Sequence, residues 1–152
     1  MGLVNAAQLA SYIGYEAPAT PWHLVDQQQI NQFADATLDH QFIHVDPERA
    51  AATPFGATIA HGFLTLSMLS HFAESFGLPV EGVEMGINYG FDSVRFLAPV
   101  TVGSRIRAHS TIIDIVEKKP HQFMFKTELS VEIEGSDTPA LAAVWLTLLM
   151  VK

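Results

Sequence analysis

The stretch that decides the fold is His61-Gly-Phe-Leu-Thr-Leu-Ser-Met-Leu-Ser-His-Phe-Ala-Glu-Ser-Phe76. On a helix, its apolar side chains fall on nearly every side: Phe63, Leu64, Leu66, Met68, Leu69, Phe72, Ala73 and Phe76. A helix with so little polar surface is typical of the centre of a domain. Gly77 is a plausible C-cap and Pro79 cannot continue a helix, so the helix is predicted to end there.

Four long strand-like segments follow this helix and are separated by turn residues. They cover Met85–Leu97, Arg105–Val116, Gln122–Ile133 and Ala140–Val151. Consecutive strands joined by turns predict an antiparallel meander. Helices followed by one run of strands favour an α+β fold, in which a curved antiparallel sheet wraps around the long central helix.

Shorter elements are predicted before the central helix. Asn5, Asp26 and Asp46 are candidate N-caps for three helices, and a brief strand lies between the first two. The predicted helices end at Tyr12, Ala36 and Ala52, and the strand covers Trp22–Val25.

Length and composition limit the classes of function. A chain of 152 residues fits a single domain over residues 1–152. With 49% hydrophobic and only 16% charged residues, we expect apolar surface that is covered in a homodimer or lines an acyl pocket. A net charge of −8 argues against nucleic acid as a partner.

The N-terminus and the residue types also exclude several possibilities. Met1–Asn5 has no basic region before an apolar run, and no apolar stretch reaches membrane-spanning length, so we expect a cytoplasmic protein without a membrane partner. No cysteine is present for a disulfide or a thiolate metal site. No Gly-x-Ser-x-Gly motif indicates a serine hydrolase.

Asp39 and His44 are the best candidates for chemistry. A carboxylate and a neutral imidazole that share one water can orient it, take its proton and return a proton elsewhere. Residues five apart do not share one helical face, so the pair can meet only if Leu38 to Ile43 form a loop or turn. Alternatively, Asp39 is a turn residue and His44 a half-buried structural histidine.

A metal site is the other chemistry that this segment suggests, because His40 and His44 are four residues apart near Asp39 and Asp46. Pro47 makes a shared helical face improbable, and the glutamate of a zincin motif is absent. We therefore expect no metal and no other cofactor.

The chain resembles the MaoC-like (R)-specific enoyl-CoA hydratases and their nodulation-protein-N-like relatives over roughly residues 20 to 150. Three segments carry the resemblance: Asp39-His-Gln-Phe-Ile-His-Val-Asp-Pro-Glu-Arg-Ala50, Thr58-Ile-Ala-His-Gly-Phe-Leu64 and Val94-Arg-Phe-Leu-Ala-Pro-Val100. The resemblance implies the hotdog fold, with Asp39 and His44 as the catalytic dyad. The family usually has glycine immediately before the aspartate, where this chain has Leu38, so this position can affect activity.

The reaction that the resemblance implies is the hydro-lyase step of fatty acid metabolism: reversible syn addition of water to a trans-2-enoyl-CoA, giving an (R)-3-hydroxyacyl-CoA. Gly62 at the start of the central helix would offer its backbone N–H to the thioester oxygen, unless this glycine only allows close packing. His61 and Asn88 are further candidates for substrate binding, although a structural role fits either residue. Side chains that could limit acyl chain length are Phe42, Phe63, Met68 and Met85.

Two other functions fit the same fold. An acyl-CoA thioesterase would activate water against the carbonyl carbon and would leave His44 without an evident role. A non-catalytic acyl-thioester-binding protein would have lost activity through Leu38. Addition of water to enoyl-CoA, release of free CoA, and binding without turnover distinguish the three.

Overall fold

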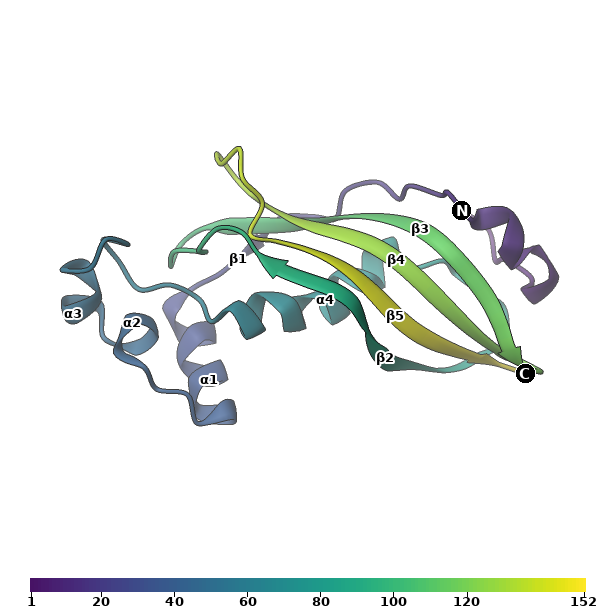
Figure 1. Ribbon diagram of the computed structural model, residues 1–152, viewed down its shortest axis with the longest axis horizontal. Helices are drawn as coiled ribbons and strands as arrows, with labels where there is room; N and C mark the ends of the chain where they lie inside the picture. Colours follow the sequence, from purple (N-terminus) through teal and green to yellow (C-terminus); the bar gives the residue numbers. More distant parts are fainter.

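A computed structural model describes residues 1–152 and shows a curved sheet wrapped around one long helix, α4 (Figure 1). This arrangement confirms the predicted α+β class. The elements in chain order are the 3₁₀ helix η1 (Ala6–Tyr12), β1 (His23–Leu24), α1 (Gln27–Thr37), α2 (Phe42–Val45), α3 (Pro47–Ala51), α4 (Gly62–Phe76), β2 (Val83–Phe96), β3 (Arg105–Lys119), β4 (Gln122–Ile133) and β5 (Leu141–Val151).

The sheet has the strand order β1-β3-β4-β5-β2, and all neighbouring strands are antiparallel. Only β3, β4 and β5 form the predicted meander. The meander prediction was wrong for β2, which pairs with β5 at the far edge instead of with β3, the next strand in the chain. The chain between β2 and β3 therefore crosses the end of the sheet, where Ile59 and Thr101 form an isolated antiparallel bridge.

The central helix buries one stripe of side chains against the concave face of the sheet. Its buried residues are Leu64, Thr65, Met68, Leu69 and Phe72, which recur at intervals of three and four. The expectation that the helix is buried all round was wrong in the single chain, because Phe63 is 68% exposed. One face of α4 thus remains exposed in the single chain, and the cavities described below lie along this helix.

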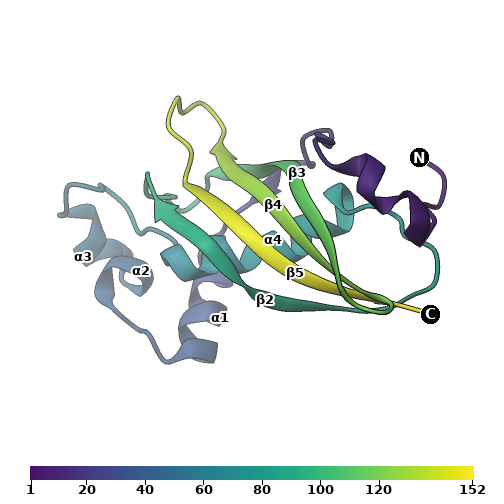
Figure 2. The ribbon, with the colours of Figure 1, turned by 45° about the vertical axis from the view of Figure 1, so that its right-hand side comes forward.

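The helices before α4 begin at the predicted caps. The side chains of Asn5, Asp26 and Asp46 accept hydrogen bonds from the backbone N–H groups of Ala7, Gln29 and Arg49. A four-residue helix, α2, was not predicted, because a single turn carries too little periodicity to be recognised. Figure 2 shows α1, α2 and α3 gathered beyond the end of the sheet, beside the N-terminal end of α4.

None of the helices is long and apolar enough to cross a membrane. The predicted cytoplasmic location and the assignment of residues 1–152 to one domain stay predictions.

Candidate active site

Asp39, His44 and His61 meet at the N-terminal end of α4. One carboxylate oxygen of Asp39 and one ring nitrogen from each histidine lie within 4.8 Å of one another. Asp39 lies in the loop between α1 and α2, His44 in α2, and His61 immediately before α4. The loop that the pairing of Asp39 and His44 requires is therefore present, and His61 joins them from a separate segment.

His44 is buried, and its hydrogen bonds fix which nitrogen is available for chemistry. Nδ1–H donates to the carbonyl oxygen of Ile59 at 2.7 Å, so in the neutral ring Nε2 carries the lone pair. Burial lowers the pKa of His44 below its usual 6.5, and nearby His61 lowers it further; the Ile59 carbonyl and the Asp39 carboxylate oppose this shift. At neutral pH, His44 is consequently a neutral base.

A short network holds the segment that carries His44. The side-chain amide of Gln27, on α1, donates to the His44 carbonyl oxygen at 2.8 Å and accepts from the Thr58 hydroxyl at 2.5 Å. The backbone N–H of Ile59 donates to the carbonyl oxygen of Ile43 at 3.0 Å. These bonds tie α1, α2 and the segment before α4 together, so the imidazole of His44 is held rigidly.

His61 contacts both Asp39 and His44. Its Nε2–H donates to the backbone carbonyl oxygen of Asp39 at 3.0 Å, and its ring stacks on that of His44 with the centroids 3.8 Å apart. The His61 side chain is only 3% exposed, and its Nδ1 atom is buried without a hydrogen-bond partner. The bond to the Asp39 backbone indicates that His61 positions the aspartate.

The carboxylate of Asp39 faces solvent more than the two imidazoles do. Its side chain is 53% exposed, and one oxygen accepts from the backbone N–H of Gln41 at 3.3 Å. The other oxygen lies 4.0 Å from Nε2 of His61. An exposed carboxylate beside a buried neutral imidazole can bind one water between an acceptor and a base.

The same three residues are also a possible ligand set for a metal ion, because they offer two imidazoles and a carboxylate. The two rings are stacked with their planes only 23° apart. Nδ1 of His44 and Nε2 of His61 are already bonded to backbone carbonyl oxygens. The arrangement suits proton transfer better than metal ligation.

A cavity of about 250 Å³, which we call the dyad cavity, opens beside this group. It is lined by His44, Ile59, Ala60, Gly62, Thr65, Phe96, Leu97, Ala98, Pro99, Val100 and Ala140. The backbone N–H of Gly62 has no acceptor in α4, because it lies in the first turn of the helix. A Cβ atom at Gly62 would lie 3.1 Å from the ring of Phe96, so the glycine keeps this wall open.

Thr65 is a cavity residue that the sequence analysis missed. It is buried one turn after Gly62 and lines the dyad cavity. The sequence did place a hydroxyl among the apolar residues of this helix. It could not show that this side of the helix faces a cavity.

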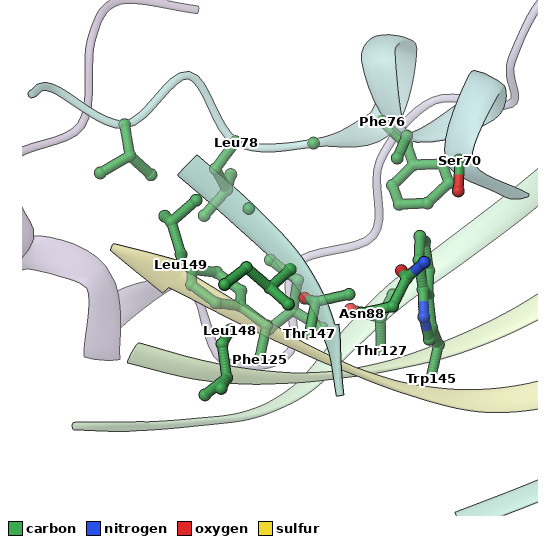
Figure 3. Close-up of a pocket in the computed structure, with 16 residues that line it drawn as sticks. Ser70, Phe76, Leu78, Asn88, Phe125, Thr127, Trp145, Thr147, Leu148 and Leu149 are labelled. Atoms are coloured by element: carbon green, nitrogen blue, oxygen red, sulfur yellow. The ribbon is translucent and has the colours of Figure 1, made fainter. Parts of the chain in front are cut away.

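Asn88 does not lie near the dyad. It lines two cavities further along α4, a middle cavity of about 350 Å³ and a far chamber of about 360 Å³. The middle cavity is lined by Leu66, Ser67, Leu69, Ser70, Asn88, Tyr89, Gly90, Phe91 and Trp145. The far chamber lies between the C-terminal end of α4 and strands β2, β4 and β5 (Figure 3).

The four predicted chain-length residues line none of these three cavities. Phe42 packs under Arg49, Phe63 is mostly exposed, Met68 belongs to the core, and Met85 is half exposed. The far chamber is closed instead by side chains such as Phe76, which come from α4 and from the strands.

Leu38 has a conformation that explains the preference for glycine before the aspartate. It ends α1 in the left-handed region, with φ 62° and ψ 21°, and its side chain is exposed. Glycine adopts this conformation without strain, whereas leucine does so at a cost of about 1 kcal/mol. The leucine side chain is 81% exposed and lines none of the three cavities.

Comparison with known proteins identifies this arrangement. The sequence profile of the family described as "MaoC like domain" matches residues 9–133. The chain belongs to the MaoC-like dehydratase family.

Relatives within this family have similar lengths. Nodulation protein N of Rhizobium leguminosarum bv. viciae is 48% identical over 148 residues, covering 96% of this chain and 91% of that protein. The 3-hydroxyacyl-thioester dehydratase Z of Mycobacterium tuberculosis (strain ATCC 25618 / H37Rv) is 47% identical over 139 residues, covering 91% of each. A solved (R)-hydratase from A. caviae involved in PHA biosynthesis has a TM-score of 0.72 at 25% identity, covering 89% of this chain and 94% of that one. The hotdog fold predicted from the sequence is confirmed.

Proposed function

We propose that this MaoC-like protein catalyses reversible hydration of a trans-2-enoyl-CoA to an (R)-3-hydroxyacyl-CoA, with Asp39 and His44 as the catalytic dyad. One observation carries the proposal: a buried, neutral His44, whose Nε2 is free, has a ring nitrogen within 4.8 Å of an Asp39 carboxylate oxygen and lines a cavity together with Gly62. The names of the dehydratase and hydratase relatives support this class of reaction.

The mechanism follows from the protonation states. A water molecule donates one hydrogen to the Asp39 carboxylate and the other to Nε2 of His44. As its oxygen bonds to C3 of the enoyl chain, His44 takes a proton, and the electron pair moves to the thioester oxygen. The protonated imidazole then returns a proton to C2 from the same side, which makes the addition syn. The atoms of one water are added and His44 is regenerated.

The negative charge that develops on the thioester oxygen needs a fixed hydrogen-bond donor. The backbone N–H of Gly62 is free, and it lies at the N-terminus of a 15-residue helix, where the helix dipole favours negative charge. Because glycine has no side chain, the thioester can approach this N–H closely.

The acyl chain would run along the open face of α4. The dyad cavity adjoins the first turn of the helix, the middle cavity its centre, and the far chamber its last turns. The middle cavity and the far chamber share Ser70, Asn88 and Trp145, so they adjoin each other. We call this row of three cavities the α4 seam.

We further propose that β2 is the contact edge of a homodimer. This 14-residue strand lies at the edge of the sheet and exposes the large apolar side chains Val83, Met85, Ile87, Tyr89 and Phe91. A long apolar edge strand is prone to pair with another strand, and antiparallel pairing of two copies would cover it. A monomer by light scattering at micromolar concentration would overturn this assignment.

The hydration reaction is tested by the loss of enoyl absorbance with crotonyl-CoA and with a longer trans-2-enoyl-CoA. Asp39→Asn and His44→Ala should abolish the loss, and the product should be the (R)-alcohol with no free thiol. The chain offers a matched control in Asp35 and His40, an exposed carboxylate–imidazole pair at 2.8 Å. Asp35→Asn and His40→Ala should retain activity. Release of CoA would indicate a thioesterase, and binding without turnover would indicate an acyl-thioester-binding protein.

A further inference from the structure

Five polar side chains line the far chamber. Thr147 is one of them, and the other four form a group that we call the polar collar: Ser70, Asn88, Thr127 and Trp145. Figure 3 shows them with Phe76 at one end of the chamber, whereas Leu78, Phe125, Leu148 and Leu149 occupy the other end. Ser70, Asn88 and Trp145 also line the middle cavity. The collar therefore lies where the middle cavity opens into the apolar end of the far chamber.

Trp145 provides the decisive observation. Its side chain is buried, with 6% exposure, and its indole N–H has no hydrogen-bond partner. Buried donors are almost always paired in folded proteins, so an unpaired one that lines a cavity indicates a missing ligand or water. Phe91, opposite on β2, stacks on the indole with the ring planes 11° apart, which holds the ring in this orientation.

The other members of the collar also keep their hydrogen-bonding capacity free. The side-chain hydrogen bonds of the protein include Ser67 to Phe63 on the same helix, but none from Ser70, Asn88 or Thr127. Ser70 and Asn88 are exposed and Thr127 is buried, and all three line the same chamber as Trp145.

The chemistry of the collar restricts what can bind there. None of the residues that line the far chamber is charged, so a carboxylate, phosphate or ammonium group would meet no counter-charge there. The indole N–H can only donate, so the ligand must offer an acceptor. A hydroxyl, keto, epoxide or ether oxygen meets both conditions. Further carbon atoms are needed beyond that oxygen, because the chamber continues as an apolar space.

We propose that the polar collar recognises a neutral oxygen within a long acyl chain, so that this protein prefers internally oxygenated acyl thioesters. The proposal rests on the proposed function, since it assumes that the thioester lies at the dyad end of the α4 seam.

The length of the helix predicts where on the chain the oxygen lies. Ser70 follows Gly62 by eight residues, which corresponds to roughly 12 Å along the axis of α4. An extended hydrocarbon advances somewhat less than one C–C bond length of about 1.5 Å per carbon, so the collar meets about the ninth or tenth carbon from the thioester.

The test is equilibrium binding of saturated acyl-CoA ligands, which the reaction does not consume. A series of 14-carbon chains carries one hydroxyl or keto oxygen at positions from C6 to C13, with myristoyl-CoA as the oxygen-free reference. The wild-type protein should bind the C9 or C10 derivatives about tenfold more tightly than isomers oxygenated elsewhere. Trp145→Phe keeps an aromatic ring but removes the N–H, and it should reduce that preference about fivefold to tenfold.

Two further variants keep the result interpretable. Thr127→Val removes a hydroxyl at nearly constant volume and should also reduce the preference. Trp22→Phe changes the other tryptophan, which packs under Arg107 on the surface, and should leave the preference unchanged. Myristoyl-CoA should bind wild-type and Trp145→Phe proteins within about threefold, which shows that the chamber is intact.

The outcomes separate this inference from the proposed reaction. The collar would be overturned as a recognition site if an oxygen at every position weakened acyl-CoA binding equally. An unchanged preference in both Trp145→Phe and Thr127→Val would overturn it too. A preference at C9 or C10 that both variants lose would support it even if no enoyl-CoA is hydrated. Hydration of plain enoyl-CoA without any oxygen preference would support the reaction and reject the collar.

Discussion

The two ends of α4 differ in charge, in hydrogen bonding and in the elements that surround them. At the N-terminal end, a carboxylate and two imidazoles come from loops and short helices and surround a free backbone N–H. At the C-terminal end, an uncharged chamber is formed mainly by side chains of three strands and contains one unpaired indole N–H. Proton transfer requires the first environment, whereas selection of an acyl chain requires only the second. If the proposed function is right, reaction and chain selection are separate, and we predict variants that affect one without the other.

The largest difference in kcat/KM on crotonyl-CoA is expected between His44→Ala and Trp145→Phe. Loss of a general base lowers rates by about 10²- to 10⁴-fold, so His44→Ala should reduce kcat/KM on crotonyl-CoA by that amount. Crotonyl-CoA has too short a chain to reach the far chamber, so Trp145→Phe should change its kcat/KM by less than about threefold. A comparable loss in both variants would show that the two ends are not independent.

The second prediction compares one glycine from each end. In Gly62→Ala, the new methyl group lies against the half-exposed ring of Phe96, which can move but then enters the dyad cavity. Displacing the thioester by about 1 Å should lower kcat on crotonyl-CoA by about tenfold to a hundredfold. Gly86→Ala adds a methyl group to open space in the far chamber and should leave this rate unchanged. Steady-state kinetics measures kcat for both variants. Equal losses of kcat in the two would contradict the account.

The third prediction concerns pH at the dyad end. Because burial lowers the pKa of His44, the imidazole stays neutral below its usual pKa of 6.5, and kcat/KM should begin to fall only at lower pH. The contribution to stability has the same sign: the unfolded chain binds a proton at about pH 6.5 while the folded chain does not, so stability should fall with decreasing pH from there down to the lowered pKa. NMR titration of the His44 ring measures the pKa directly. A midpoint above 6.5 would contradict this account.

Part of this account was predictable from the sequence because it is local. Asp39 and His44 lie in one segment of twelve residues, and Gly62 lies in a second short motif, so a resemblance could point to them directly. The collar joins α4, β2, β4 and β5, and its geometry depends on register shifts in β2 on either side of Gly90. Strand pairing between segments distant in the chain cannot be derived from local patterns, and the same limitation led to the wrong neighbour for β2.

The smallest predicted effect concerns Leu38, at the dyad end. Leu38→Gly relieves the left-handed conformation and loses little buried surface, so it should raise the free energy of unfolding by about 0.5 to 1 kcal/mol. His121, with φ 66°, lies in the turn between β3 and β4, away from the site, and His121→Gly should stabilise similarly. Urea denaturation measures both changes. A loss of activity in Leu38→Gly alone would show that leucine at this position contributes to the site.

The claim that the α4 seam is one binding site, with chemistry at one end and the chain tail at the other, is tested most directly by blocking its far end. Gly86→Phe places a large ring in the far chamber, where a Cβ atom meets nothing within 4 Å. The measurement is kcat/KM for trans-2-enoyl-CoA of 4 and of 14 carbons. The account predicts that the rate on the short substrate stays within about threefold of wild type while the rate on the long one falls at least about tenfold. Equal effects on the two substrates, or none on either, would contradict it.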